Sequence, residues 1–289
     1  MPGMKVIGIV LLFSALSQSQ SINSWKHLLI EDIHVSGTRS LDTSQLSEII
    51  GPLNQMKIND GEEEIRERIR FQFQEHGYFD VRIESLRIKK VDPLVSPIPV
   101  WVDADVREGV RFRFGEIQFT GNHALTADDL RSAFPIRTGE FFSRGKIGSG
   151  LESIRRMYGE LGYIDMTCIP DTTKGDGTVG LHIEIGEGPQ YRMGALQFAG
   201  NSNLAEQLRP RWTLEAAEAF NSKYLDDFFK QNESLLPSDF VVNQSVTIAR
   251  NCRDNTVTVF VELGPNHPSV IAPKDYGCDP KSAENSQQK

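Results

Sequence analysis

The side chains that most often do chemistry are spread along this sequence without the spacings that catalysis or metal binding requires. The 289 residues contain no His-Glu-x-x-His segment and no Cys-x-x-Cys pair, which are common arrangements of zinc or redox ligands. The six histidines also show no metal-ligand spacing: His27, His34, His76, His123, His182 and His267. We therefore expect no metal site, no cofactor and no enzymatic activity.

A few segments resemble catalytic or nucleotide-binding motifs only in part. Gly139–Lys146 looks like a phosphate-binding loop, but its glycine spacing is one residue too long and Ile147 stands where a magnesium-binding Ser or Thr is required. Gly148–Gly150 lacks the further glycines of a dinucleotide-binding loop and lies within a helical period. Asp80 and Asp165 would need to face one site to act as paired acids. Their matching sequence contexts predict turn residues instead.

The cysteines give two interpretations that the sequence leaves open. The three are Cys168, Cys252 and Cys278, an odd number. In an oxidising compartment Cys252 and Cys278 could form a disulfide, because one ends a predicted strand and the other lies in the segment that follows the same domain. Unpaired cysteines acting as small apolar side chains are the alternative.

Charge and the N-terminal residues indicate an exported protein. The net charge is −8, from 39 acidic and 31 basic residues, and no basic stripe suggests nucleic-acid binding. At the end of the apolar run Val6–Leu16, the small residues Ala15 and Ser17 stand three positions and one position before a cleavage point at Gln18, as a signal peptidase requires. A membrane anchor is disfavoured, since a span needs about 20 apolar residues. We expect residues 1–17 to be a signal peptide and the mature chain to have no transmembrane segment.

One stretch recurs three times and sets the domain organisation. The alternating strand pattern of Val110–Asn122, which ends in Gly-Asn, returns at Arg192–Asn201 and, more weakly, at Ile30–Gly37. These copies predict three domains, over residues 28–109, 110–189 and 190–265. Residues 266–289 are polar and proline-containing, so we expect a disordered tail there.

Each repeat is predicted to run strand, helix, helix, strand, strand. The clearest helix has Ile147, Leu151, Ile154, Tyr158 and Leu161 at helical spacing. A crossover through two helices makes the first strand parallel to its partner, whereas the final hairpin is antiparallel. The predicted fold class is therefore α+β, with three tandem βααββ domains. Each would be a mixed three-stranded sheet covered on one face by two antiparallel helices.

The repeated motifs resemble those of the polypeptide-transport-associated (POTRA) domain. In the second repeat they are Gly121-Asn122, Gly162-Tyr163-x-Asp165 and Gly188-Pro189. Domains of this family lie in the periplasm ahead of a membrane β-barrel. They receive unfolded outer-membrane proteins or partner lipoproteins, commonly by pairing a chain with an exposed strand. Only 24 residues follow Pro265, so we expect no barrel in this sequence. The resemblance implies a periplasmic location, associated with the outer membrane, and clients or partners from its assembly machinery.

A client chain would bind by adding a strand to a sheet edge. The second strand of each repeat is the expected edge: Val81–Lys89, Ile164–Ile169 and Val242–Ala249. In the first repeat Arg87, Lys89 and Lys90 are charges of the kind that block edge pairing. We therefore favour the second repeat as the contact site, with the residues Ile164, Asp165, Met166, Thr167, Cys168 and Ile169. The alternatives are a structural cell-envelope or division component, or a fragment of a split barrel-assembly protein.

Overall fold

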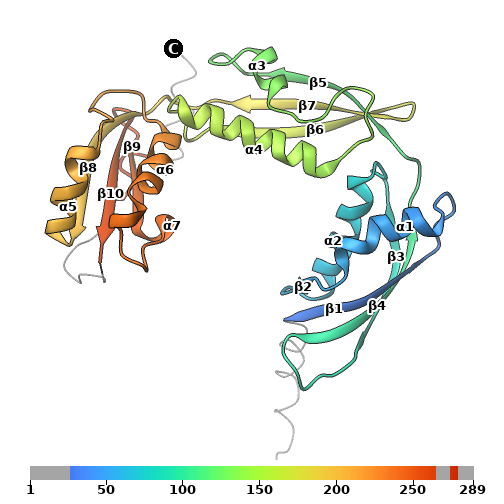
Figure 1. Ribbon diagram of the computed structural model, residues 1–289. Helices are drawn as coiled ribbons and strands as arrows, with labels where there is room; N and C mark the ends of the chain where they lie inside the picture. The colour runs from blue at the N-terminus through green and yellow to red at the C-terminus, as the bar shows by residue number, and fades with distance from the viewer. Residues whose placement is uncertain (1–26, 265–273, 279–289) are drawn as a thin grey trace, which may run out of the picture. The chain divides into compact units, whose positions relative to one another are not determined.

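The computed structural model describes residues 27–264 and 274–278 and divides into two compact units (Figure 1). The first unit comprises the chain up to Arg113 together with Phe141–Arg144, and the second comprises Phe114–Glu140 and the chain from Gly145 onward. The first unit holds one sheet and the second holds two. The predicted signal peptide, residues 1–17, lies outside the described residues.

The first sheet has four strands in the order β2-β1-β4-β3. Its elements are β1 (Leu28–Ser36), α1 (Thr43–Ile50), β2 (Lys57–Ile58), α2 (Glu62–Glu75), β3 (Arg82–Lys90) and β4 (Ile98–Arg107). β1 is parallel to β4, and β3 is antiparallel to it. The core forms where one face of α2, with Ile65, Ile69 and Phe73 fully buried, meets the alternate apolar residues of β4. The prediction of three strands missed β2, which pairs with the start of β1.

The second sheet has the order β5-β7-β6. Its elements are β5 (Arg113–Thr120), α3 (Ala127–Ser132), α4 (Arg144–Glu160), β6 (Thr167–Gly175) and β7 (Thr178–Gly186). α4 lies along the sheet and buries Ile147, Ile154 and Tyr158, as its helical period predicts (Figure 1). A β-carbon at Gly150 would come within 2.2 Å of the Phe134 ring. Close packing against that ring therefore explains a glycine inside this helix, despite its low helix propensity.

The third sheet has the order β8-β10-β9. Its main elements are β8 (Arg192–Gly200), α5 (Ser202–Leu208), α6 (Ser222–Gln231), α7 (Val242–Ser245), β9 (Val246–Asn251) and β10 (Thr256–Leu263). The predicted strand Val242–Ala249 is wrong over its first four residues, which form the single turn α7. α6 ends at Gln231, and a 3₁₀ turn follows over Glu233–Leu235.

The predicted α+β class and the βααββ order are confirmed, and the first and third sheets each combine a parallel pair with antiparallel pairs. The strand predicted to be second in each repeat, which is β3, β6 or β9, lies at a sheet edge. In the described part of the chain, no helix has the length and apolar character that crossing a bilayer would require. The expected disordered tail is wrong for residues 274–278, which pair with β9. The rest of that tail lies outside the described residues.

Candidate peptide-binding edge

β6 is an open edge strand that pairs on one side with β7, from Thr167 opposite Gly186 to Gly175 opposite Thr178. Its side chains are exposed along almost the whole strand, and Ile169 is 60% exposed. An edge strand presents backbone N–H and C=O groups that no neighbouring strand satisfies. β6 can therefore accept a further strand along its outer side.

The six residues predicted for this edge divide into two groups. Thr167, Cys168 and Ile169 are the first residues of β6, as predicted. Residues 164–166 precede the strand instead, so the predicted boundary was three residues too early. The Ile164 side chain packs against the core of the third sheet, and the Asp165 carboxylate is bound to Tyr191 and Arg250. Ile164 and Asp165 therefore belong to a junction within the second unit, and the backbone N of Met166 donates to the Tyr163 carbonyl at 3.3 Å in the turn before the strand.

The outer side of β6 is itself protected beyond Ile169. Pro170 has no N–H, and prolines within sheets occur where that N–H would face away from the neighbouring strand. The backbone N–H of Thr172, two residues further along the strand, points to the same outer side. Its backbone N donates to Oδ1 of Asp171 at 2.8 Å. The strand that can accept a partner freely is therefore short and centred on Cys168. The proline was visible in the sequence, directly after the predicted segment.

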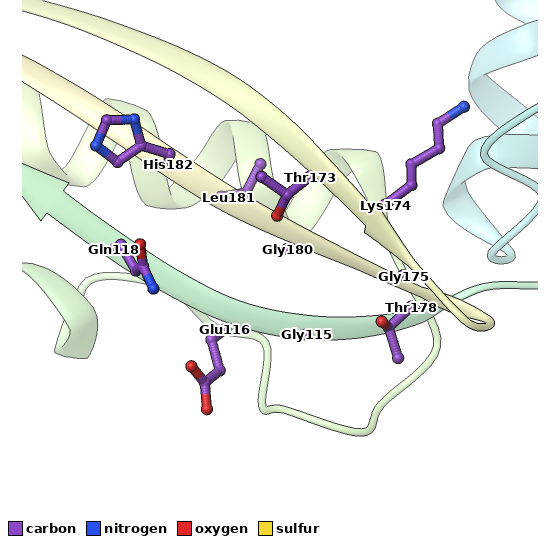
Figure 2. Close-up of a pocket in the computed structure, with 10 residues that line it drawn as sticks. All are labelled: Gly115, Glu116, Gln118, Thr173, Lys174, Gly175, Thr178, Gly180, Leu181 and His182. Atoms are coloured by element: carbon purple, nitrogen blue, oxygen red, sulfur yellow. The ribbon is translucent and has the colours of Figure 1, made fainter.

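A shallow hollow of about 400 Å³ lies on the sheet face beside this edge (Figure 2). Glycines at positions 115 and 180 form its floor. The hollow exists because these two positions have no side chain. A β-carbon at Gly180 would lie 2.8 Å from Oγ1 of Thr173 and 3.1 Å from the carbonyl oxygen of Glu116. Its rim is polar and includes Gln118, Lys174 and His182. The hollow offers hydrogen-bonding groups next to β6.

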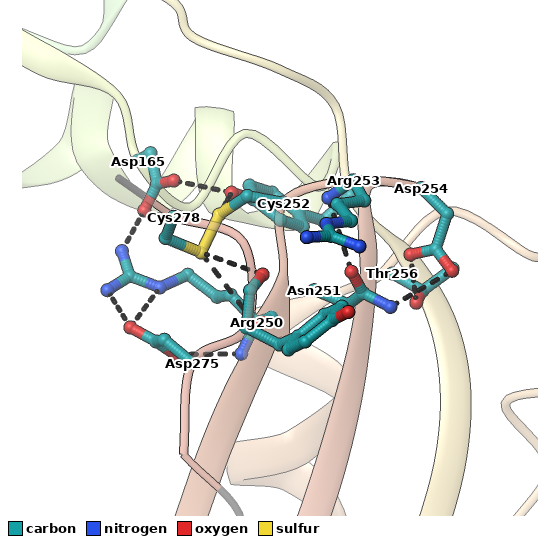
Figure 3. The surroundings of a disulfide bond; sticks show 11 residues. Asp165, Arg250, Asn251, Cys252, Arg253, Asp254, Thr256, Asp275 and Cys278 are labelled. Atoms are coloured by element: carbon teal, nitrogen blue, oxygen red, sulfur yellow. Dashed lines mark hydrogen bonds and ion pairs between the residues drawn. A yellow bond between two sulfur atoms is a disulfide. The ribbon is translucent and has the colours of Figure 1, made fainter. Parts of the chain in front are cut away.

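The junction beside β6 is built around Asp165 (Figure 3). Tyr191, whose side chain is fully buried, donates a 2.7 Å hydrogen bond from its hydroxyl to Oδ2 of Asp165. Arg250 binds the other carboxylate oxygen and also Asp275. Burial, followed by the bond to Asp165, raises the pKa of Tyr191 well above its ordinary value. The Tyr191 hydroxyl therefore remains a proton donor at any physiological pH.

The Gly-Tyr-x-Asp motif has a structural role at this junction. The carbonyl oxygen of Gly162 accepts a 2.8 Å hydrogen bond from the backbone N of Tyr191. Gly162 has φ +89°, and a β-carbon there would lie 2.5 Å from the Tyr191 carbonyl oxygen, so both the backbone conformation and the space require glycine. In the first unit, Gly77 accepts in the same way from Phe112, also at 2.8 Å. The motif therefore fixes the start of the next repeat.

The C-terminal residues of the described chain cover part of the β9 edge. Cys252 and Cys278 form a disulfide, the first of the two interpretations that the sequence allowed. The backbone N of Tyr276 donates to the Arg250 carbonyl at 2.8 Å, and the Tyr276 carbonyl accepts from the Cys252 N at 2.9 Å. We call residues 274–278 the strap. It forms an isolated parallel bridge between Tyr276 and Asn251, so the chain lays an extended segment against its own sheet edge (Figure 3).

The Glu-Gly pairs that close the first two repeats bind the turn after the first strand. Glu187 Oε1 accepts from the backbone N atoms of His123 and Ala124 at 2.6 and 2.8 Å and from the Tyr158 hydroxyl at 2.8 Å. Glu108 accepts from Arg39 and Ser40 in the same way. Burial acts to raise the pKa of Glu187, but these hydrogen bonds outweigh it and hold the pKa below its ordinary value.

Within the described residues, no group of three or more His, Cys, Asp or Glu side chains could hold a metal ion.

Comparison with known proteins identifies a family that shares this arrangement. Residues 112–188 match the family model POTRA, described as the surface antigen variable number repeat. The second repeat is a POTRA domain. A crystal structure of POTRA domains 3–5 of BamA from Haemophilus influenzae has a similar fold. The alignment covers 84% of this chain and 98% of that structure, with a TM-score of 0.62 and 18% sequence identity. The tandem POTRA fold therefore extends over most of the chain.

Two curated relatives resemble this sequence. The outer membrane protein assembly factor BamA of Buchnera aphidicola is 25% identical over 154 residues, which is 52% of this chain and 24% of the relative. A putative outer membrane protein assembly factor of Treponema pallidum is 24% identical over 178 residues, or 57% of this chain and 20% of the relative. The aligned part of this POTRA protein thus spans about a quarter or a fifth of these relatives. It resembles the periplasmic part of BamA.

Proposed function

We propose that this chain is a periplasmic binding or scaffold protein that assists outer-membrane protein assembly. In this proposal it binds extended segments of unfolded outer-membrane proteins, or of an assembly-complex partner, as an added strand on a POTRA sheet edge. The similarity to outer-membrane assembly factors supports the biological setting. The proposed role is binding without catalysis.

The observation that carries the mechanism is the strap on β9. Three outward backbone groups of this edge have partners in the strap. The Arg250 N donates to the Asp275 carboxylate, the Arg250 carbonyl accepts from the Tyr276 N, and the Cys252 N donates to the Tyr276 carbonyl. An extended segment therefore fits the outer side of the hairpin strand in this fold. β6 occupies the equivalent place in the second sheet, and there the described chain supplies no such segment. We infer that the start of β6, from Thr167 to Ile169, accepts a client segment in the same geometry.

The physical basis of such binding is mostly independent of client sequence. Main-chain hydrogen bonds to an edge give affinity to any extended peptide, and neighbouring side chains add selectivity. Exposed Ile169 supplies an apolar contact, and the polar hollow on the sheet face lies close by. Clients with alternating apolar and polar residues, as in the strands of outer-membrane proteins, match this combination.

The test is a proline substitution that removes one outward backbone donor. Pro170 is already accommodated in β6, and Cys168 lies two residues before it with the same orientation, so Cys168→Pro should leave the β6–β7 ladder intact. Cys168→Val keeps the N–H and is the matched control. We expect peptides of alternating aromatic and polar residues to shift the amide resonances of residues 167–169 in the Val variant. The same peptides should lose most of their affinity for the Pro variant.

Two results would contradict this proposal. One is an absence of resonance shifts in the 167–169 stretch when peptide is added. The other is equal peptide affinity of the Pro and Val variants, with the fold of both checked by their amide spectra. Either result would mean that β6 does not capture extended chains through its backbone.

A further inference from the structure

The connection between β3 and β4 carries an unusual group of exposed apolar side chains. Leu94 is 94% exposed, Val95 46% and Val91 42%. They lie in a short loop whose ends are joined by a 2.9 Å hydrogen bond from the backbone N of Val91 to the Pro99 carbonyl. A second bond, from the Leu94 N to Oδ1 of Asp92, fixes the turn within it. The loop therefore holds exposed Leu94 and Val95 beyond a closed base, where Val91 lies.

An aromatic residue and basic residues stand directly behind this tip. Lys89 pairs with Trp101 across β3 and β4, and its Nζ lies 5.0 Å from the Trp101 ring centroid. Trp101 is 46% exposed, because it occupies the face of β4 opposite to the buried residues Val100 and Val102. Its indole N–H donates to Oε2 of Glu31 at 3.1 Å. Lys90 adds a second basic residue at the end of β3.

This order of side chains matches the layers of a membrane surface. Apolar side chains at a tip can enter the acyl boundary, which amphipathic segments reach to a depth of about 5–10 Å. Tryptophan and lysine prefer the headgroup level, where an aromatic ring or an aliphatic stem meets apolar matter and the polar end stays in water. A strand rises about 3.3 Å per residue, so the Lys89–Trp101 pair stands about 7 Å behind the Val91–Pro99 pair that closes the loop.

A protein partner is the less suitable occupant. Specific protein interfaces bury broad complementary surfaces of about 800 Å² on each partner. Here the exposed apolar groups are few and lie in a short loop, with only the Lys89–Trp101 pair and Lys90 behind them. We propose that the β3–β4 tip is a membrane-contact site that inserts Leu94 and its neighbours into a lipid bilayer, with a preference for anionic headgroups. This site is separate from the peptide-binding edge and does not depend on it.

The test is vesicle flotation with the full chain. The vesicles are phosphatidylcholine alone or phosphatidylcholine mixed with phosphatidylglycerol. We expect the wild-type chain to float with both and more strongly with the anionic mixture. Leu94→Asp should reduce binding about tenfold or more, since burial of one leucine accounts for at least that factor. Ile169→Asp, which changes another exposed apolar residue, on β6, is the control and should float like the wild type.

A second measurement places the tip in the bilayer. Leu94→Trp should gain fluorescence quenching by lipids brominated in the acyl chain, relative to the wild-type background from its own tryptophans. The proposal is overturned if the purified wild type does not float, if Leu94→Asp floats as well as the wild type, or if the tryptophan at position 94 is not quenched. Peptide binding by the same variants separates the two sites, because Leu94→Asp should leave it unchanged.

Discussion

The Tyr191 hydroxyl and the Asp165 carboxylate are joined by a 2.7 Å hydrogen bond that connects the loop before β6 to the segment before β8. Tyr191→Phe removes this bond and keeps the buried ring. We expect the second unit to lose about 1 kcal/mol of unfolding free energy, the usual net contribution of one hydrogen bond. Urea denaturation followed by fluorescence measures the loss.

Asp165→Ala should be more damaging, because it leaves the buried Tyr191 hydroxyl without this acceptor. The expected cost is about 1–3 kcal/mol, since the buried hydroxyl then has only the Sγ of Cys252, a weak acceptor at 3.1 Å, as a partner. In the double variant the two losses should not add, because the residues share one bond. Asp171→Ala on β6 is the exposed control. Fully additive losses would show that Tyr191 and Asp165 stabilise the unit independently of each other.

The disulfide closes a loop with a sequence separation of 26 residues. A chain-entropy model gives about 3.5 kcal/mol of stabilisation for a loop of that size. Reducing the protein, or replacing Cys252 and Cys278 with alanine, should therefore lower the unfolding free energy of the second unit by about that amount. Cys168→Ala provides the control, because Cys168 is a free cysteine. An unchanged denaturation midpoint on reduction would contradict this prediction.

The sequence was sufficient for elements with a strong period. α4 was predictable because its apolar residues recur at helical spacing. The hairpins were predictable because their strands alternate and end at turn residues. α7 was missed because Val241, Val242 and Val246 have high strand propensity, and only the structure places a helical turn between them. β2 was missed because two residues are too few to show a period.

The candidate site was predictable only in part, for a different reason. That β6 lies at an edge follows from the order of the elements. The role of Asp165 does not, because its partners Tyr191 and Arg250 belong to the next repeat and meet it only after packing. The strap has the polar composition of a disordered tail. Its order comes from one disulfide and a few hydrogen bonds to β9, which leave no periodic signal.

Acid should destabilise the second unit through Glu187. Hydrogen bonds from two backbone N–H groups and from Tyr158 hold the folded pKa of Glu187 below its ordinary value, against the opposing effect of burial. A carboxylate with a depressed pKa contributes stability above its unfolded pKa, about 4.3, and this stability is lost as the pH falls through the lower folded pKa. Stability should therefore decrease below about pH 4.3. The decrease should be shallower in Glu187→Gln than in the exposed control Glu184→Gln. Equal pH slopes would assign the acid sensitivity to other groups.

Release of the strap should open a second peptide-binding edge. The outward backbone groups of Arg250 and Cys252 are bonded to Tyr276 and Asp275, so a client strand cannot reach them while the strap is in place. Replacing both cysteines with alanine, together with Asp275→Ala, removes the disulfide and the ion pair with Arg250. We expect amide exchange at Cys252, now alanine, to speed up, and extended peptides to gain a second site at residues 246–252.

The strap variant also distinguishes the two edges. In a chain that carries Cys168→Pro as well, the remaining peptide binding should reside entirely in β9, with resonance shifts confined to the third sheet. Tyr276→Pro in the otherwise wild-type chain is the matched control. It deletes the one strap N–H that bonds to the Arg250 carbonyl and leaves the disulfide in place. If exchange at position 252 stays as slow as in the wild type after the strap contacts are removed, the strap does not protect this edge.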